Sequence, residues 1–348
     1  MEYQSILPIF TLDNDFHMKK ESILVIGACG QIGSELLPEL RRAHGAFRVV
    51  AADRLPPHNG PLKAGPYEQL DFLDCRALGA IIDRYDINQV YHLAAMLSVT
   101  GEKNPQQAWD LNMQSLLNVL DLAREKKLAR VFWPSSIAVF GAHPPNHGCP
   151  QDTPHDPGTG YGISKTAGEH WCRYYHAKYG LDTRSLRYPG LISHRTLPGG
   201  GTTDYAVDIF HQAVTAKRYT CFLRPDTLLP MMYMPDAIRA TLELMQAPAA
   251  RLSTRGAYNI GAMSFTPAVL AAEITRHVPA LQISYAPDHR QSIADSWPGR
   301  IDDSAARRDW KWSHDYELAA MTRDMLVHLG IGKETADDSK TLTFGVLQ

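Results

Sequence analysis

A short glycine-rich stretch near the start of the chain limits its fold more than any other feature. Residues 26–33 read IGACGQIG, directly after the apolar run 23–26 and at the start of a helical pattern over 31–44. Glycines between a buried strand and a helix allow a tight turn and a close approach of the backbone to a ligand. The stretch therefore predicts a strand, a turn and a helix that open an α/β unit.

Apolar runs and helical patterns continue to alternate through the first half of the chain. Further strands are expected at 47–52, 89–95 and 130–135, and helices at 78–85, 105–127 and 161–179. Strands that alternate with helices in this way predict a Rossmann, doubly wound parallel sheet with helices on both faces.

The pattern changes after about residue 188, where scattered prolines and the triplet Gly199-Gly200-Gly201 indicate irregular connections. We expect this part to form a smaller, more loop-rich α/β lobe that binds the substrate. The expected domains are a leader or tag-like extension at 1–17, a cofactor-binding Rossmann domain at 18–190 to which 228–262 returns, a substrate-binding lobe over most of 191–330, and a weakly ordered tail at 331–348.

Composition and charge restrict the class of protein. With 348 residues, 44% of them hydrophobic and 21% charged, the chain is typical of a globular protein with a sizeable core. Its formal charge of -2 leaves no excess of basic residues for a phosphate backbone, so we expect no nucleic-acid partner. No apolar run reaches the roughly 20 residues of a transmembrane helix, so we expect no membrane partner. The five cysteines include no C-x-x-C pair, which indicates a reduced, cytoplasmic protein.

A carboxylate at the end of the second expected strand completes a cofactor-binding pattern. Asp53 lies twenty positions after Gly33, where it can accept hydrogen bonds from a ribose 2′-hydroxyl and would repel a 2′-phosphate. Together with the glycines it forms a dinucleotide fingerprint that favours NAD over NADP. Arg54 leaves an alternative open, because an arginine nearby can accommodate a phosphate. Otherwise its side chain stays in solvent or stacks near the adenine.

Tyr161 and Lys165 form a Y-x-x-x-K pair at the start of the helical pattern over 161–179. Positions i and i+4 share one helix face, so the phenol and the ammonium point into the same space. Beside a positively charged nicotinamide, Lys165 would lower the phenol pKa from its usual value of about 10 and make Tyr161 a general base. A Y-x-x-x-K motif on its own is more often a surface contact. The dinucleotide fingerprint upstream reverses this and favours catalysis.

Two serines, Ser135 and Ser136, stand at the carboxyl end of the strand expected at 130–135. Ligands of doubly wound sheets bind beyond the carboxyl ends of the strands, so a hydroxyl there can hydrogen-bond a reacting oxygen. The alternative is a serine that only caps the end of the strand.

The segment 143–155 contains possible zinc ligands at close spacing: His143, His147, Cys149 and His155. The segment is also a proline-rich loop. We interpret these side chains as polar loop groups or as the rim of a pocket, and we expect no functional metal.

These features together resemble the extended short-chain dehydrogenase/reductase superfamily over about residues 18–329. Longer blocks are similar to the short-chain family of L-threonine 3-dehydrogenases: YGISKTAGE (161–169), LRYPGLIS (186–193), PGGGTTDYAVDIFHQAV (198–214), LLPMMYMPDAIRATLELM (228–245), YNIGAMSFTP (258–267) and SWPGRIDDSAARRDWKW (296–312). The resemblance implies a metal-independent oxidation of L-threonine at its β-hydroxyl to 2-amino-3-oxobutanoate, with NADH as the second product. It also implies a homodimer in which the helices expected at 105–127 and 161–179 pair with their copies in the second subunit.

The resemblance assigns roles to individual residues. Tyr161 would be the general base, supported by Lys165, and Ser136 would orient the substrate oxygen with Ser135 sharing the work. Substrate contacts would come from Ser98, Thr202, Thr203 and Trp297, in addition to Ser136 and Tyr161, and Asn112 would position the catalytic helix through water. The expected cofactor-binding positions are Gly27, Gly30, Gln31, Ile32, Gly33, Asp53, Arg54, Asp71, Phe72, Leu93, Ala94, Ala95, Lys165 and Tyr188.

Two other functions remain as alternatives. The first is a nucleotide-sugar epimerase or dehydratase of the same superfamily, although a dehydratase typically has an acidic pair after the catalytic hydroxyl, where this chain has Ile137 and Ala138. The second is a non-catalytic NAD-binding sensor. Sensors of this kind tend to lose the tyrosine or the lysine, and the sequence has both Tyr161 and Lys165.

Overall fold

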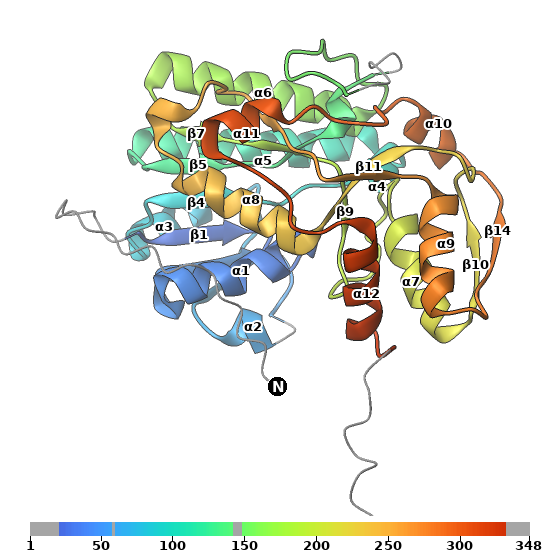
Figure 1. Ribbon diagram of the computed structural model, residues 1–348. Helices are drawn as coiled ribbons and strands as arrows, with labels where there is room; N and C mark the ends of the chain where they lie inside the picture. The colour runs from blue at the N-terminus through green and yellow to red at the C-terminus, as the bar shows by residue number, and fades with distance from the viewer. Residues whose placement is uncertain (1–20, 58–59, 142–147, 332–348) are drawn as a thin grey trace, which may run out of the picture.

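A computed structural model describes residues 21–57, 60–141 and 148–331 (Figure 1). The extension expected at 1–17 lies outside the described residues, as does the expected tail beyond residue 331. None of the helices in the described ranges has the length and apolar character needed to span a membrane.

The centre of the protein is a six-stranded sheet in which every neighbouring pair is parallel. The strands follow the order β3-β2-β1-β4-β5-β7. Their bounds are β1 Ile23–Ile26, β2 Val49–Asp53, β3 Tyr67–Gln69, β4 Gln89–His92, β5 Arg130–Phe132 and β7 Thr183–Arg184. The order reverses between β1 and β4, which confirms the predicted doubly wound Rossmann sheet and places its ligand-binding crevice at that point.

The two faces of the sheet are built from alternate residues of its strands. In β1, Ile23 and Val25 belong to the core under α1 (Gln31–His44) and α8 (Met234–Gln246). Leu24 and Ile26 belong to the opposite core, under α3 (Cys75–Arg84), α5 (Pro105–Glu125) and α6 (Gly160–Tyr179). Because both faces are covered by helices, β1 reads as a continuous apolar run rather than as an alternating pattern. Figure 1 shows α1 and α8 together on one side of the sheet.

Three expected strands have different bounds in the structure. The strand expected at 47–52 begins only at Val49, after a short 3-10 helix over Ala46–Arg48. The strand expected at 89–95 ends at His92, where the chain leaves the sheet. The strand expected at 130–135 ends at Phe132, two residues before Pro134, which has no N–H to continue the ladder.

The second half of the chain holds more regular structure than the loop-rich lobe expected from its prolines. It forms two small sheets, ordered β10-β14 and β13-β11-β9, and supplies β8 and β12 to a third, β12-β8-β6, whose strand β6 comes from the first half. Their strands are β6 Ser135–Ser136, β8 Leu186–Tyr188, β9 Gly190–Ile192, β10 Arg218–Cys221, β11 Leu229–Tyr233, β12 Tyr258–Asn259, β13 Met263–Phe265 and β14 Gln282–Tyr285. The remaining helices are α2 Gly60–Lys63, α4 Ser98–Glu102, α7 Tyr205–Thr215, α9 Pro267–His277, α10 Arg290–Asp295, α11 Ser304–Trp310 and α12 Leu318–His328, with short 3-10 helices at Ile137–Val139 and Ala249–Arg251.

A separate core holds the substrate side together. Buried side chains of α7, α9 and α12, among them Phe210, Leu270 and Met325, pack with Ile192 of β9 in one cluster. These apolar positions recur at helical spacing between the prolines, so the prolines mark helix starts and connections rather than a general lack of structure. Pro267, for example, is the first residue of α9, where its missing N–H costs nothing.

Candidate active site

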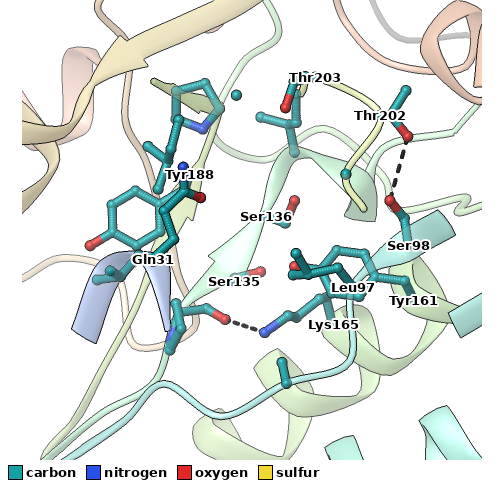
Figure 2. A pocket seen from close by; sticks show the side chains of 18 of the residues that line it. Gln31, Leu97, Ser98, Ser135, Ser136, Tyr161, Lys165, Tyr188, Thr202 and Thr203 are labelled. Carbon is teal, nitrogen blue, oxygen red and sulfur yellow. Dashed lines mark hydrogen bonds between the residues drawn. The ribbon is translucent and has the colours of Figure 1, made fainter. Parts of the chain in front are cut away.

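A cavity of about 140 Å³ opens at the carboxyl edge of the central sheet (Figure 2). Most of the predicted catalytic, substrate and nicotinamide-side residues line it: Gln31, Ile32, Leu93, Ala95, Ser98, Ser135, Ser136, Tyr161, Lys165, Tyr188, Thr202, Thr203 and Trp297. Residues that lie up to about 270 positions apart in the chain, from Gln31 to Trp297, thus meet in one place.

Tyr161 enters the cavity from the first turn of α6. Thr159 caps this helix, since its hydroxyl accepts a hydrogen bond of 3.0 Å from Gly162 N, and this fixes where the first turn begins. Burial raises the pKa of Tyr161 to about 12, although a hydrogen bond with Ser136 lowers it. Among the described side chains burial is the largest effect, and the lowering by Lys165 beside a bound nicotinamide remains a prediction.

Lys165 lies one turn further along α6 and is almost fully buried. Its Nζ donates a hydrogen bond of 2.6 Å to the carbonyl of Pro134 and lies 4.3 Å from the centroid of the Trp133 ring. Burial lowers the pKa of Lys165 to about 7. Figure 2 shows the ammonium directed at this carbonyl rather than at the phenol of Tyr161, so the sequence spacing placed both groups in the pocket but did not predict this contact.

The two predicted serines have different surroundings. Ser136 lies close enough to Tyr161 for its hydroxyl to lower the pKa of the phenol, and its Oγ accepts a hydrogen bond of 3.2 Å from Ala138 N. Ser135 instead donates a hydrogen bond of 2.6 Å to Glu169, a fully buried carboxylate on α6. The hydroxyl proton of Ser135 is therefore engaged inside the protein, and Ser136 is the serine whose side chain is coupled to the predicted base.

Glu169 is the centre of a buried ion pair beneath the pocket. Arg187 donates to both of its carboxylate oxygens, at 2.9 and 2.8 Å, and is itself 4% exposed. Burial opposes the charged form of Glu169, but the hydrogen bonds and charge of Arg187 outweigh it and lower the pKa. The ion pair joins α6 to β8, and its carboxylate also fixes the hydroxyl of Ser135 by a hydrogen bond.

The predicted substrate residues gather at the other end of the cavity. Ser98 Oγ and Thr202 Oγ1 lie 3.4 Å apart, and Figure 2 shows Thr203 beside them. Asp204 fixes the glycine-rich segment that carries these threonines, since its Oδ2 accepts hydrogen bonds of 2.8 and 2.7 Å from Gly200 N and Gly201 N.

The glycine loop forms a cradle at the start of α1. Gly27 has φ +82°, a conformation that side chains with a Cβ rarely adopt, and a Cβ there would lie 2.7 Å from the backbone nitrogen of Ala94. Gly30 precedes the first turn of α1, whose free N–H groups favour an anion. The cradle therefore fits the pyrophosphate of a dinucleotide.

Asp53 supports the same loop from the end of β2. Its Oδ2 accepts a hydrogen bond of 2.9 Å from Cys29 N and its Oδ1 one of 3.1 Å from Leu55 N. Arg54 and Phe72 line a second hollow beside Gly30. Asp71 lies in neither cavity, and its carboxylate accepts a hydrogen bond from Leu73 N in its own turn.

We expect the Gly33→Ala substitution to weaken both the fold and dinucleotide binding. Its methyl group would collide with Gly27 O and lie 2.8 Å from Cα of Ala28, so the loop must shift at a cost of about 1–3 kcal/mol. Urea unfolding and an NADH fluorescence titration measure the two effects. Gly158→Ala, which meets no heavy atom within 4 Å, is the matched control. Equal stability and NADH affinity in the two variants would contradict this account of the loop.

The possible metal ligands of the proline-rich loop are only partly described. His143 and His147 lie outside the described residues. Cys149 is buried and its thiol donates to Thr153 Oγ1, while His155 lies 3.8 Å from Glu169. The two described residues therefore have partners within the protein.

The sequence did not identify two groups that shape the site. Glu169 stands one helical turn after Lys165, so its spacing indicates that it lies on the same helix face as the catalytic pair. Its partner Arg187 comes from β8, and the sequence gives no sign of that contact. Asp204 follows the glycine triplet at the spacing at which a carboxylate commonly accepts backbone N–H groups. Asn112, expected to act through water, instead accepts directly from Met96 N at 2.8 Å and donates to Ser164 Oγ at 3.4 Å.

Comparison with known proteins finds solved structures with the same fold as this chain, and relatives that are named L-threonine dehydrogenases. The chain is 46% identical over 322 residues to the mitochondrial L-threonine 3-dehydrogenase of Bos taurus, covering 90% of this chain and 86% of the relative. Among solved structures, the holo form of the GalE-like L-threonine dehydrogenase of Cupriavidus necator matches with a TM-score of 0.87 and 59% identity over 88% of this chain and 99% of that one. The L-threonine dehydrogenase of Clostridium difficile matches with a TM-score of 0.87 and 46% identity over 90% and 99%.

A family model covers most of the part of the chain that forms the site. It is the NAD dependent epimerase/dehydratase family, which matches residues 23–261 and so includes the glycine loop, Asp53, Ser136, Tyr161 and Lys165. On this match, and on the level of identity to its relatives, the chain belongs to the NAD dependent epimerase/dehydratase family.

Proposed function

We propose that the protein is an NAD-dependent L-threonine 3-dehydrogenase that oxidises the β-hydroxyl of L-threonine to 2-amino-3-oxobutanoate. The observation that carries the proposal is the small cavity in which Tyr161 and Ser136 lie together with the glycine-loop residue Gln31 and the hydroxyls of Ser98 and Thr202. Relatives at 46% and 59% identity that bear the name L-threonine dehydrogenase support it.

The proposed mechanism divides the work among few groups. Tyr161 takes the proton of the β-hydroxyl, and Ser136 holds the same oxygen in place. NAD, when bound on Gly27, Gly30 and Asp53, supplies the hydride acceptor. With NAD bound, the positive charges of the nicotinamide and of the Lys165 ammonium, which is held on the Pro134 carbonyl, would favour the phenolate form of the base.

The substrate end of the cavity suits a small zwitterion. Hydroxyls of Ser98, Thr202 and Thr203 can donate hydrogen bonds to its carboxylate, and Trp297 forms an apolar wall.

NADH formation with purified protein tests this function. L-threonine with NAD should give NADH absorbance that persists with EDTA, while L-serine, L-allo-threonine and NADP should each give a slower reaction. If L-threonine gives no NADH although NAD binds, the proposal is wrong, and nucleotide sugars become the next substrates to test.

Asp53→Ser should shift cofactor preference toward NADP. The substitution removes the charge that repels a 2′-phosphate and leaves Arg54 nearby, so we expect the ratio of kcat/KM for NADP over NAD to rise at least about tenfold, which corresponds to ~1.4 kcal/mol. Asp74→Ser removes an equal charge from the N-cap of α3, away from the loop, and should leave the ratio unchanged. A ratio that is the same in both variants would rule out Asp53 as the determinant.

The domain division, the assembly and the location belong to the same proposal. Residues 18–190 with 228–262 are assigned to NAD binding and most of 191–330 to the substrate. A homodimer is supported by large apolar side chains on α5 and α6 that are more than a third exposed: Trp109, Ile163, Trp171, Tyr174 and Tyr179. A cytoplasmic location is supported by the five cysteines, all of which are free thiols.

A further inference from the structure

Two histidines and an aspartate meet on the substrate side, away from the active-site cavity. His194 follows β9, whereas Asp324 and His328 lie four residues apart in the last turns of α12. One donor atom from each of the three lies within 4.8 Å of the other two. Figure 1 shows α12 beneath β9, which brings these distant parts of the chain together.

We propose that His194, Asp324 and His328 bind a divalent transition-metal ion, with Zn²⁺ the best match. Imidazole nitrogen and carboxylate oxygen are ordinary zinc ligands, and three protein ligands with water complete a four-coordinate site. Zinc–ligand distances of about 2.0–2.2 Å place neighbouring donors about 3.3–3.6 Å apart, so side-chain rotations, including one that separates the two stacked rings, are needed to close the site. The i, i+4 spacing already puts Asp324 and His328 on one face of α12.

The hydrogen bonds of both rings leave the same nitrogen available to a metal. His328 Nδ1 lies 2.9 Å from the backbone carbonyl of Asp324, which can only accept, so this nitrogen carries the proton. His194 Nδ1 lies 3.1 Å from the Tyr233 hydroxyl, whose own proton goes to Asp324 Oδ2 at 2.6 Å. Nδ1 of His194 is then also the donor, and Nε2 of each ring keeps a free lone pair.

This second layer of contacts is typical of metal sites. Metal-binding histidines usually donate their other N–H to a carbonyl, a carboxylate or another fixed acceptor, which sets the tautomer and the ring orientation. Here Tyr233 on β11 connects His194 with Asp324, and the rings of His194 and His328 stack with centroids 3.9 Å apart. The three side chains are thus neighbours before any ion binds. One ring must rotate out of the parallel stack, because each imidazole lone pair lies in the plane of its ring.

A bound ion would join α12 to the segment that leads toward the substrate loop. Ser193, next to His194, donates a hydrogen bond to Glu35 on α1, and the chain continues from there to Thr202 and Thr203. The site would therefore stabilise the contact between the C-terminal helix and the active-site side of the protein without contributing to the hydride chemistry.

Zinc titration of the tag-free full-length protein, stripped with EDTA and desalted, tests the site. Isothermal titration calorimetry should show one more Zn²⁺ equivalent for the wild type than for the His194→Ala/His328→Ala variant, and at least tenfold weaker binding for His328→Ala alone. Co²⁺ in the wild type should give tetrahedral d–d absorption at this equivalent without the charge-transfer band of a thiolate ligand. Zn²⁺ should raise the thermal midpoint of the wild type but not of the double variant.

His277→Ala is the matched control. Glu273 and His277 form the same i, i+4 carboxylate–histidine pair on α9, with their atoms 3.9 Å apart. Among the described residues, no third metal-ligating side chain joins this pair in the way that His194 joins Asp324 and His328. This variant should bind Zn²⁺ as the wild type does. If the wild type and the folded double variant take up the same number of Zn²⁺ ions with equal affinity, the proposed site does not exist.

Discussion

Tyr161→Phe should lower kcat by about 10²- to 10⁴-fold, because it removes the group that takes the proton from the β-hydroxyl. The ring and its packing stay, so the pocket should keep its shape. Since burial raises the pKa of Tyr161 to about 12 and the base must be deprotonated, wild-type activity should also rise with pH on the alkaline side of neutrality. The sign follows from the role: a proton acceptor gains activity as it loses its own proton.

The control for this variant is cofactor binding. An NADH fluorescence titration of Tyr161→Phe should match the wild type within a few-fold, because the glycine loop and Asp53 lie outside the change. Residual activity above about a tenth of the wild-type value would show that Tyr161 is not the base. An unchanged pH profile in a residually active variant would lead to the same conclusion.

Glu169→Ala should cost about 3–5 kcal/mol of the free energy of unfolding, because it leaves Arg187 charged and buried without its partner. Arg187 is 4% exposed and still contacts Gln151 O and Asn259 Oδ1, so it cannot move easily to solvent. Ser135 would lose its acceptor at the same time. Urea unfolding followed by circular dichroism measures the loss.

The matched control is an ion pair on the surface. Glu39 and Arg42 lie 2.8 Å apart with side chains that are 41% and 62% exposed, and such pairs contribute about 0–1 kcal/mol. Glu39→Ala should therefore change the free energy of unfolding by no more than that. If Glu169→Ala costs no more than Glu39→Ala, the buried pair does not stabilise the fold as described.

The central sheet could be predicted from the sequence because local signals agree with the global fold there. A window of about twenty residues is enough to recognise the apolar run over Ile23–Ile26, the glycines that follow it and the helix over Gln31–His44. The same holds for Tyr161 and Lys165, which one helix places in one pocket. Parallel order and the crevice then follow from general rules of α/β topology.

Features that depend on distant contacts could not be predicted in this way. The strand expected to end at residue 135 is interrupted near Pro134, and Ser135 and Ser136 pair with β8 in a different sheet. Ser135 and Ser136 are neighbours in sequence, yet only the fold shows that one faces Glu169 and the other Tyr161.

Burial adds an effect on the phenol that the sequence does not show. The spacing of Tyr161 and Lys165 suggests a simple effect of a nearby positive charge. In the folded protein desolvation raises the pKa of Tyr161 to about 12 and lowers that of Lys165 to about 7. Desolvation depends on all the neighbours of a group and is not visible in a four-residue spacing.

Transfer of deuterium from L-threonine labelled at Cβ tests the central claim most directly. If this pocket oxidises the β-hydroxyl, incubation with NAD should give NADH that carries the deuterium, detected by mass spectrometry, together with an unlabelled 2-amino-3-oxobutanoate that decarboxylates. A protein that returns the hydride to its substrate, as an epimerase does, would give no net labelled NADH. Failure to find deuterium in NADH, with NAD bound and Tyr161 intact, would contradict the proposed reaction.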